Sequence, residues 1–305
     1  VYTDYCEMLK NDEVDAVCIC VPSGLHGECV IACAKAGKHV LCEKPLDIHT
    51  DVMTSMIQAC NDNHVKMGCV FQNRTKPALI KAKELLDSGE LGRLLIVECQ
   101  YRGYRSPAYY KSAGWRGTWA LDGGGCLMNQ GIHAVDAMCW LAGDVESVVA
   151  VTDHKFRDIE VEDTANALLQ FKNGASGVLM GTTLSHASET SPESDFLRFE
   201  CENGTIIYSS GNATLYLQDG DSFSSTSVKT VSLTPEAKHD GETSASDPTK
   251  ISTYGHCVHV RDLNSAIIED RDPMITGESA RIGVDVVLAV YESSRQGGKV
   301  PVRHS

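Results

Sequence analysis

The first 71 residues alternate short apolar runs with stretches of helical spacing, and this alternation limits the fold more than any other feature. Each apolar run is short and bounded by turn residues, which is typical of strands. Strands are expected at 15–22, 38–45 and 65–71, and helices at 4–11, 25–36 and 49–63. Such alternation indicates crossover connections, so we predict a parallel sheet with helices on both faces. The strand at 15–22 should be buried on both faces.

After residue 77 the pattern changes from alternation to clustered strands. Helices are expected at 77–88, 125–142, 256–269 and 278–295, a polar loop at 234–250, and strands at 93–104, 146–153, 163–171, 175–184, 197–208, 214–218 and 228–233. The Asn173-Gly174 pair between two of these strands is a strong hairpin signal. Strands that follow one another without helices favour an antiparallel or mixed sheet, so the second part of the chain is predicted to be α+β.

Charge and cysteine usage narrow the classes of partner. The formal net charge of -14 argues against a sequence-independent grip on nucleic acid and against binding to an anionic membrane. No apolar run approaches the roughly 18 residues of a membrane span. The 13 cysteines form no Cys-x-x-Cys pair, so neither a disulfide framework nor a metal site is expected, and a reducing cytoplasm fits best. Cys18, Cys20 and Cys69 lie in apolar runs and are interpreted as small buried hydrophobes.

The tripeptide Glu43-Lys44-Pro45 is the first feature that could carry chemistry. It ends a predicted parallel strand, and ligands of open α/β sheets bind at the carboxyl ends of strands. A lysine beside a reacting hydroxyl can take its proton when burial lowers the lysine pKa. The alternative interpretation is a surface ion pair before a turn.

The second feature is a glycine run, Gly123 to Gly125, followed by Asn129, His133 and Asp136. Asn129 and His133 are four residues apart on one predicted helix and share a face. Histidine is the usual acid or base near neutral pH, and Asp136 is near enough to orient it. The alternative is a structural glycine turn followed by a hydrogen-bonded core histidine.

Aromatic and basic residues interleave in the third feature. Its members are Tyr104, Arg105, Tyr109, Tyr110, Trp115, Arg116 and Trp119. Aromatic faces stack on the C–H surfaces of sugars, and a guanidinium binds oxygens in a fork, so the run suits a carbohydrate or an anionic group. An interface or core cluster is an equally good interpretation.

Three segments together resemble the glucose–fructose oxidoreductase, inositol dehydrogenase and rhizopine-catabolism (Gfo/Idh/MocA) family. They are VDAVCICVPSGLHGECVIACAKAGKHVLCEKPL, GGGCLMNQGIHAVDAMCWLAG, and the C-terminal HCVHVRDLNSAI with GESARIGVDVVLAVYESSRQGGKV. The resemblance implies a Rossmann-type dinucleotide-binding domain, here partial at 1–75, and an α+β domain with a large, mostly antiparallel sheet at 76–305. The last helix is expected to pack back on the first domain. A homodimer or homotetramer is also implied.

The resemblance further implies an enzyme that uses NAD or NADP. It would oxidise a secondary hydroxyl of a sugar, glycoside, nucleotide sugar or cyclitol by hydride transfer. By motif position, the catalytic residues would be Lys44, His133 and Asn129. The cofactor would be lined by Pro22, Ser23, His26, Glu43, Lys44 and Gln72, and the substrate by Arg74, Arg105, Tyr110, Trp115, Arg116, Asn129 and His133. Two alternatives stay open: a relative that recycles NAD while cleaving glycosidic bonds, and a non-catalytic dinucleotide-binding regulator.

Two departures from the family pattern matter. Asn129 stands where inositol-type members carry aspartate, and an amide cannot act as a base, so proton transfer would fall to Lys44 and His133. The glycine-rich phosphate loop that opens family members is not found before the first apolar run. We therefore expect roughly 50–60 further residues upstream of Val1. The position that distinguishes NAD from NADP belongs to that segment.

Overall fold

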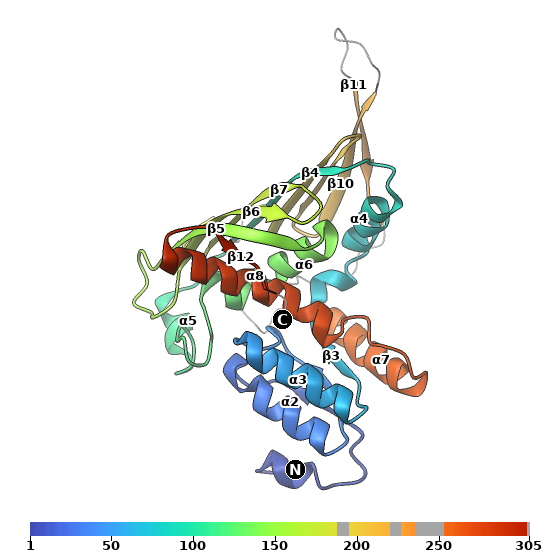
Figure 1. Cartoon of the computed structure of the whole chain (residues 1–305), viewed down its shortest axis with the longest axis vertical. Coiled ribbons are helices and arrows are strands. Elements are labelled where there is room, and N and C mark those ends of the chain that lie inside the picture. The colour runs from blue at the N-terminus through green and yellow to red at the C-terminus, as the bar shows by residue number, and fades with distance from the viewer. Residues whose placement is uncertain (188–194, 220–226, 236–252, 304–305) are drawn as a thin grey trace.

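The computed structural model describes residues 1–187, 195–219, 227–235 and 253–303. A small parallel sheet of β1 (Ala16–Ile19), β2 (His39–Cys42) and β3 (Met67–Cys69) lies near the N-terminus, in the order β1-β2-β3 (Figure 1). Three helices alternate with these strands: α1 (Tyr5–Met8), α2 (His26–Lys35) and α3 (Thr50–Asp62). The predicted alternation of helices and parallel strands is confirmed.

Local chemistry sets the ends of these helices. The Asp4 carboxylate accepts a hydrogen bond from Cys6 N at 2.8 Å and caps α1. After α2 the chain turns at Gly37, whose φ of 70° is left-handed and favours glycine. The Asp47 carboxylate accepts from Gly27 N at 3.0 Å and so ties the start of α2 to the loop after β2.

The expectation that the first strand is buried on both faces is wrong. Ile19 is buried, but Cys18 and Cys20 are exposed. Helix α2 packs on β1 and β2, whereas α7 (Tyr254–Ile268) packs on β2 and β3, so one face of β1 has little cover. These two cysteines are therefore not core residues, whereas Cys69 is buried as predicted.

The second sheet has nine strands in the order β11-β10-β9-β8-β4-β7-β6-β5-β12. Its strands are β4 (Leu94–Arg102), β5 (Val145–Asp153), β6 (Thr164–Phe171), β7 (Ser176–Thr182), β8 (Asp195–Cys201), β9 (Thr205–Ser209), β10 (Asn212–Asp219), β11 (Ser227–Ser232) and β12 (Val300–Pro301). Within this sheet the β4–β7 pair is parallel, and the other described pairs are antiparallel. The predicted fold class, a parallel sheet plus a large mostly antiparallel one, is confirmed.

Two hairpins test the strand predictions directly. The Asn173-Gly174 turn joins β6 to β7 as expected, with a left-handed φ of 92° at Gly174. The single strand expected at 197–208 is wrong, because the chain reverses between β8 and β9. Cys201 N donates to Gly204 O at 2.8 Å and closes that turn. The loop expected at 234–250 lies almost entirely outside the described residues.

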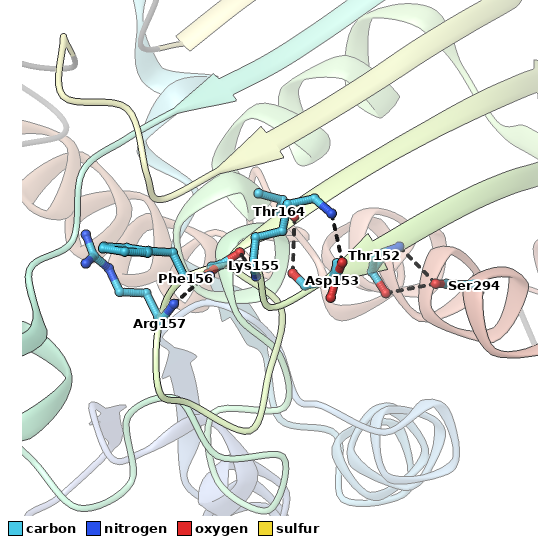
Figure 2. Close-up of polar contacts among 8 residues, drawn as sticks. Thr152, Asp153, Lys155, Phe156, Arg157, Thr164 and Ser294 are labelled. Carbon is cyan, nitrogen blue, oxygen red and sulfur yellow. Dashed lines mark hydrogen bonds and ion pairs between the residues drawn. The ribbon is translucent and has the colours of Figure 1, made fainter.

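Helices cover one face of the large sheet (Figure 1). They are α4 (Pro77–Ser88), which packs on β9 and β10, α6 (Ile132–Ala142), on β4 and β8, and α8 (Gly277–Gln296), on β5. Thr152 of β5 is fixed to α8, since its N and Oγ1 lie 2.9 and 3.0 Å from Ser294 Oγ (Figure 2). On the other face, Val149, Leu168 and Val178 align across β5, β6 and β7 and are exposed. The homodimer or homotetramer stays a prediction.

The last helix also contacts the small sheet. Cys69 N donates to Ile275 O at 3.1 Å just before α8, and Thr50 Oγ1 at the start of α3 donates to Asp285 Oδ1 at 3.1 Å. One buried apolar cluster runs from the small sheet into the large one. The domain boundary at residues 75 and 76 stays a prediction. Among the described residues, no helix is long and apolar enough to cross a membrane.

Candidate active site

Lys44 reaches from the carboxyl end of β2 to the start of α6. Its Nζ donates a hydrogen bond to the main-chain oxygen of Asn129 at 2.6 Å. Beside it, Glu43 Oε1 lies 3.1 Å from His256 Nε2 of α7. Two residues at the end of one strand are thus fixed by two different helical elements, so the alternative of a surface ion pair before a turn does not fit.

The helix that carries Asn129 begins as a π-helical turn, η3 (Cys126–Gly131), and continues as α6. The expected helix at 125–142 is therefore present, but its first turn is widened, a feature frequent at functional sites. The preceding glycines allow a very close approach to other elements. A Cβ on Gly125 would lie 1.8 Å from Glu162 O, and one on Gly124 would lie 2.1 Å from Tyr291 Oη.

Glu162 caps this widened turn by accepting hydrogen bonds from its backbone. Its two carboxylate oxygens accept from Gly125 N at 2.7 Å and Leu127 N at 2.9 Å, and Tyr291 Oη donates to Oε1 at 2.9 Å. Burial raises the pKa of Glu162 to about 7, although the two backbone hydrogen bonds and the tyrosine act in the opposite direction. The carboxylate stabilises the turn that receives Lys44, and no motif in the sequence pointed to it.

We expect Glu162→Gln to lower the free energy of unfolding by about 1–3 kcal/mol at pH 5, because one backbone N–H loses its acceptor. The folded pKa of about 7 lies above the ordinary 4.5, so the folded protein holds this proton more tightly than the unfolded chain. The contribution of Glu162 to stability is full below pH 4.5 and falls as the pH rises through 7. Urea unfolding measured between about pH 5 and 8 should show that the difference in free energy of unfolding between wild type and variant becomes smaller as the pH rises.

The matched control for this prediction is Glu160→Gln. Glu160 Oε2 accepts from Trp119 N at 3.0 Å and is exposed, so this variant removes a nearby carboxylate while keeping Glu162. It should retain the wild-type slope of stability against pH. A gap between wild type and Glu162→Gln that does not change with pH contradicts the prediction.

The surroundings of Lys44 make its side-chain ammonium more acidic than usual. Burial lowers the pKa of Lys44, and the positive charges of Arg105 and Arg116 lower it further, against the carboxylates of Glu43 and Asp122. The pKa of Glu43 is lowered: burial opposes its charge, but the hydrogen bond with His256 and the charge of Lys44 outweigh burial. The site therefore combines a carboxylate that stays ionised with an amine that gives up its proton more readily than usual.

His133 is half-buried on α6, with its ring edge against Phe71 at a centroid distance of 5.9 Å. Burial holds its pKa well below the usual range, and the charges of Lys44 and Lys76 act in the same direction. The imidazole is therefore neutral near pH 7. A neutral imidazole keeps one N–H donor and one nitrogen acceptor, so it can hydrogen-bond to a hydroxyl without adding a charge.

Asp122 and Lys76 belong to this neighbourhood and were missed from the sequence. The Asp122 carboxylate accepts from the Asn129 side-chain amide and from Gly117 N, the latter at 2.7 Å. Lys76 Nζ donates to Tyr208 Oη at 2.7 Å, and burial lowers the Lys76 pKa to about 8. Asp122 directly precedes the glycine run, but nothing in the local pattern distinguishes it from a surface acid.

Asp136 does not orient His133 as expected, because it pairs with Arg74. Arg74 Nε and Nη2 donate to the two Asp136 oxygens at 2.9 and 2.6 Å, and Nη1 donates to Ser279 Oγ at 2.6 Å. All three guanidinium nitrogens are thus engaged with neighbouring side chains of the protein. Arg74, expected to contact substrate, instead joins α6 to α8, and we assign it a structural role.

His26 is likewise turned into the protein. Its Nδ1 lies 2.8 Å from Pro45 O and its Nε2 lies 3.0 Å from Val21 O, and the side chain is 1% exposed. Both ring nitrogens face backbone carbonyls, so the ring offers no free polar atom to a cofactor. It fixes the end of β1 to the loop after β2, and we assign it this role in place of cofactor contact.

The other expected cofactor residues lie at one edge of the small sheet. Pro22 and Ser23 follow β1, Glu43 and Lys44 follow β2, and Gln72 opens the short helix η2 (Gln72–Thr75) after β3. Carboxyl ends of parallel strands meet at the same edge, where α/β proteins bind nucleotides. Gln72 Oε1 is buried there without a hydrogen-bond partner, an acceptor that a bound amide could satisfy. These residues fit a nicotinamide dinucleotide.

The expected substrate residues Arg105, Tyr110, Trp115 and Arg116 lie between β4 and the glycine run. Tyr110 Oη donates to Thr183 Oγ1 at 3.2 Å, and Arg116 Nη1 donates to Tyr109 Oη at 2.6 Å. The two arginines influence the charge of Lys44, so this segment borders the Lys44 site. A separate cavity of about 670 Å³ lies between α3 and the start of α8 and contains none of these residues.

Comparisons with known proteins agree with this architecture. Residues 1–71 match the family model described as "Oxidoreductase family, NAD-binding Rossmann fold", and residues 79–207 match "GFO/IDH/MocA C-terminal domain". The levoglucosan dehydrogenase of Pseudarthrobacter phenanthrenivorans is 26% identical over 231 residues, 68% of this chain and 58% of that protein. The myo-inositol 2-dehydrogenase of Thermotoga maritima is 32% identical over 183 residues, 58% of this chain and 52% of that protein.

The matched stretch thus spans between half and three fifths of these two relatives. Among solved structures, the WlbA dehydrogenase of Bordetella pertussis in complex with NADH and UDP-GlcNAcA is 28% identical with a TM-score of 0.80. That alignment covers 99% of this chain and 83% of the WlbA chain. Two models of one family, matched in order along the chain, agree with the small parallel sheet and the large mostly antiparallel sheet. The chain belongs to the Gfo/Idh/MocA family of oxidoreductases.

Proposed function

We propose that this protein is an NAD(P)-dependent dehydrogenase that oxidises a secondary hydroxyl of a sugar, glycoside, nucleotide sugar or cyclitol. The observation that carries the proposal is the pair formed by Lys44 and His133. A buried amine with a lowered pKa and a neutral imidazole border the edge of the parallel sheet where a dinucleotide would bind. The lowered pKa of Lys44 makes its ammonium give up a proton more readily than usual, and the imidazole of His133 is held neutral.

Each residue has a separate task in this reaction. The amine of Lys44 donates one hydrogen to Asn129 O, which fixes its direction and leaves its lone pair to take the hydroxyl proton. His133, whose neutral ring keeps one N–H group, donates a hydrogen bond to the oxygen of the same hydroxyl and aligns it. A nicotinamide held at this edge of the sheet would supply the hydride acceptor for the carbinol carbon. The carbon becomes a carbonyl, and the proton passes from Lys44 to solvent.

Names of relatives support the substrate class. The similar proteins act on levoglucosan and myo-inositol, and the WlbA dehydrogenase was solved with UDP-GlcNAcA. All three molecules present secondary hydroxyls on a six-membered ring. The half-buried Trp115 supplies an aromatic face of the kind that stacks on such rings.

Cofactor reduction by the full-length protein tests the proposal. NAD+ and NADP+ are each offered with hexoses, glycosides, an anhydro sugar, inositols and nucleotide-linked hexoses, and absorbance is followed near ~340 nm, where reduced nicotinamide absorbs. We expect net reduction with at least one ring alcohol, and a fall in kcat of about 100-fold in His133→Ala. Exposed His154→Ala is the control and should retain wild-type rates.

Two other outcomes would replace the proposal. Cleavage of a glycoside without net cofactor reduction indicates a glycosidase-type relative that recycles NAD. Ligand binding without turnover of any compound indicates a dinucleotide-binding regulator.

A further inference from the structure

Cations and aromatic rings alternate in a cluster beside the Lys44 site. This arginine–aromatic cluster consists of Tyr104, Arg105, Tyr109, Trp115, Arg116 and Arg157. The Arg116 guanidinium carbon lies 4.4 Å from the Tyr109 ring centroid and 4.6 Å from that of Trp115, and Arg105 lies 5.1 Å from Tyr109. Arg157, which follows Phe156 in the loop after β5 (Figure 2), lies 5.2 Å from the Tyr104 ring.

The N–H groups of these arginines are only partly engaged in hydrogen bonds. Arg116 Nη1 donates to Tyr109 Oη at 2.6 Å, and Arg105 Nη1 donates to Tyr104 O at 3.0 Å. The Nε atoms of both arginines, and of Arg157, are buried without a hydrogen-bond partner among the described residues. Buried donors of this kind are costly when they stay unsatisfied, so the arrangement favours an incoming acceptor.

Two buried arginines elsewhere in the chain pair with carboxylates. Arg74 pairs with Asp136 at 2.6 Å and Arg281 with Asp285 at 3.1 Å, both in buried positions. In the described part of the chain, no carboxylate lies within ion-pair distance of Arg105 or Arg116, although acids outnumber bases 41 to 27 in the sequence. In an acidic protein, two half-buried cations without an acidic partner are a local specialisation rather than a general surface property.

The charged groups nearest Lys44 also favour an anionic ligand. The positive charges of Arg105 and Arg116 act on Lys44 there. Of the two nearby carboxylates, Glu43 is engaged with His256, and Asp122 accepts hydrogen bonds from Asn129 and Gly117. Among the described residues neither carboxylate lies within ion-pair distance of Arg105 or Arg116, so the two guanidinium groups stay available to an anionic ligand.

We propose that the substrate oxidised at Lys44 carries an anionic group, a carboxylate or a phosphate, that binds Arg105 and Arg116. The proposal rests on the dehydrogenase function proposed above and names the substrate class. A guanidinium binds either anion through two parallel hydrogen bonds, and stacking on Tyr109 holds both arginines in place for it. Gln130 Nε2 also donates to Tyr109 Oη, at 3.1 Å, and helps to fix the position of that ring.

Four compounds that share a hexose ring separate the possibilities: D-glucose, D-glucuronate, D-glucose 6-phosphate and UDP-D-glucose. Binding to the full-length protein is measured by titration calorimetry, and oxidation by cofactor reduction. We expect at least one anionic compound to bind about 10-fold or more tighter than D-glucose, since hydrogen bonds to charged groups are the strong ones. The glucuronate and phosphate arms tell which anion the site prefers.

The variants Arg116→Gln and Arg105→Gln test whether these two arginines bind the anionic group. Each should lower the affinity for the anionic compound about 10- to 100-fold more than the affinity for D-glucose. Arg93→Gln is the control, because Arg93 is exposed and pairs with Glu202 at 2.7 Å away from the cluster. It should leave the preference of the wild type unchanged.

The outcomes distinguish this proposal from the dehydrogenase function. Oxidation of neutral and anionic sugars alike, or equal losses for both in Arg116→Gln, overturns the anion site and leaves the dehydrogenase intact. Anion binding that Arg116→Gln abolishes, with no oxidation of any sugar, supports the anion site and overturns the dehydrogenase. Absence of both binding preference and oxidation overturns both.

Discussion

Replacing Lys44 by methionine lowers kcat for oxidation of the ring alcohol by about 1,000-fold or more in the full-length protein. Methionine has a similar length, but its thioether is too weak a base to take the hydroxyl proton. Without that proton transfer the hydroxyl cannot become a carbonyl as the hydride leaves. The fold should persist, because the substitution removes a buried amine rather than leaving one unpaired. Initial rates and thermal unfolding of the same preparation give the two readouts.

Lys38→Met is the matched control. Lys38 is also buried, 8% exposed, and its Nζ also donates to a main-chain oxygen, Asn11 O at 3.0 Å. The two variants lose the same chemical group in similar surroundings, but only Lys44 borders the candidate site. Lys38→Met should keep a kcat within about 2-fold of wild type. A Lys44→Met protein that retains wild-type turnover overturns the assignment of Lys44 as proton acceptor.

Removing one partner of the Arg74–Asp136 pair gives the largest expected loss of stability. Asp136 is fully buried, and both its oxygens are held by Arg74 at 2.6 and 2.9 Å. Arg74→Ala therefore leaves a carboxylate without its cation in the core, at a cost of about 3–5 kcal/mol in the free energy of unfolding. Urea denaturation, with the midpoint and slope fitted together, measures the loss.

The double variant Arg74→Met with Asp136→Leu separates the buried charge from the packing. It removes both charged groups, so no unpaired ion stays in the core, and it should be more stable than Arg74→Ala alone. Lys172→Ala, which breaks an exposed pair with Asp144 at 2.9 Å, should change little. A double variant as unstable as Arg74→Ala contradicts the explanation by an unpaired charge.

Some errors of sequence interpretation had local causes. The strand expected at 197–208 contains the turn between β8 and β9. Gly204, whose main-chain oxygen closes that turn, lies in an otherwise β-rich stretch that favours one continuous strand. The burial assigned to Cys18 and Cys20 assumed helices on both faces of every parallel strand. That cover depends on where α7 packs, and α7 begins more than two hundred residues further along the chain.

Other features could not have been found from local pattern at all. Asp136 lies three positions from His133 but pairs with Arg74, 62 positions away. Glu162 caps a turn 35 to 37 residues before it in the sequence. Proximity along α6 predicts His133 as the partner of Asp136. The packing of η2 against α6 instead brings two N–H donors of Arg74 to the carboxylate.

The sequence alone determined most of the helices and strands, the change from a parallel to a mostly antiparallel sheet, and the position of Lys44 at the end of a parallel strand. Hydrophobic period, turn glycines such as Gly37 and Gly89, and prolines act over a few residues, so they can be recognised before folding is considered. Tertiary structure decided which side chains meet: Lys44 with Asn129 O, Glu162 with the widened turn, and Arg116 with Tyr109. The physical reason is that pairing, burial and pKa depend on distances between elements far apart in the chain, which only packing fixes.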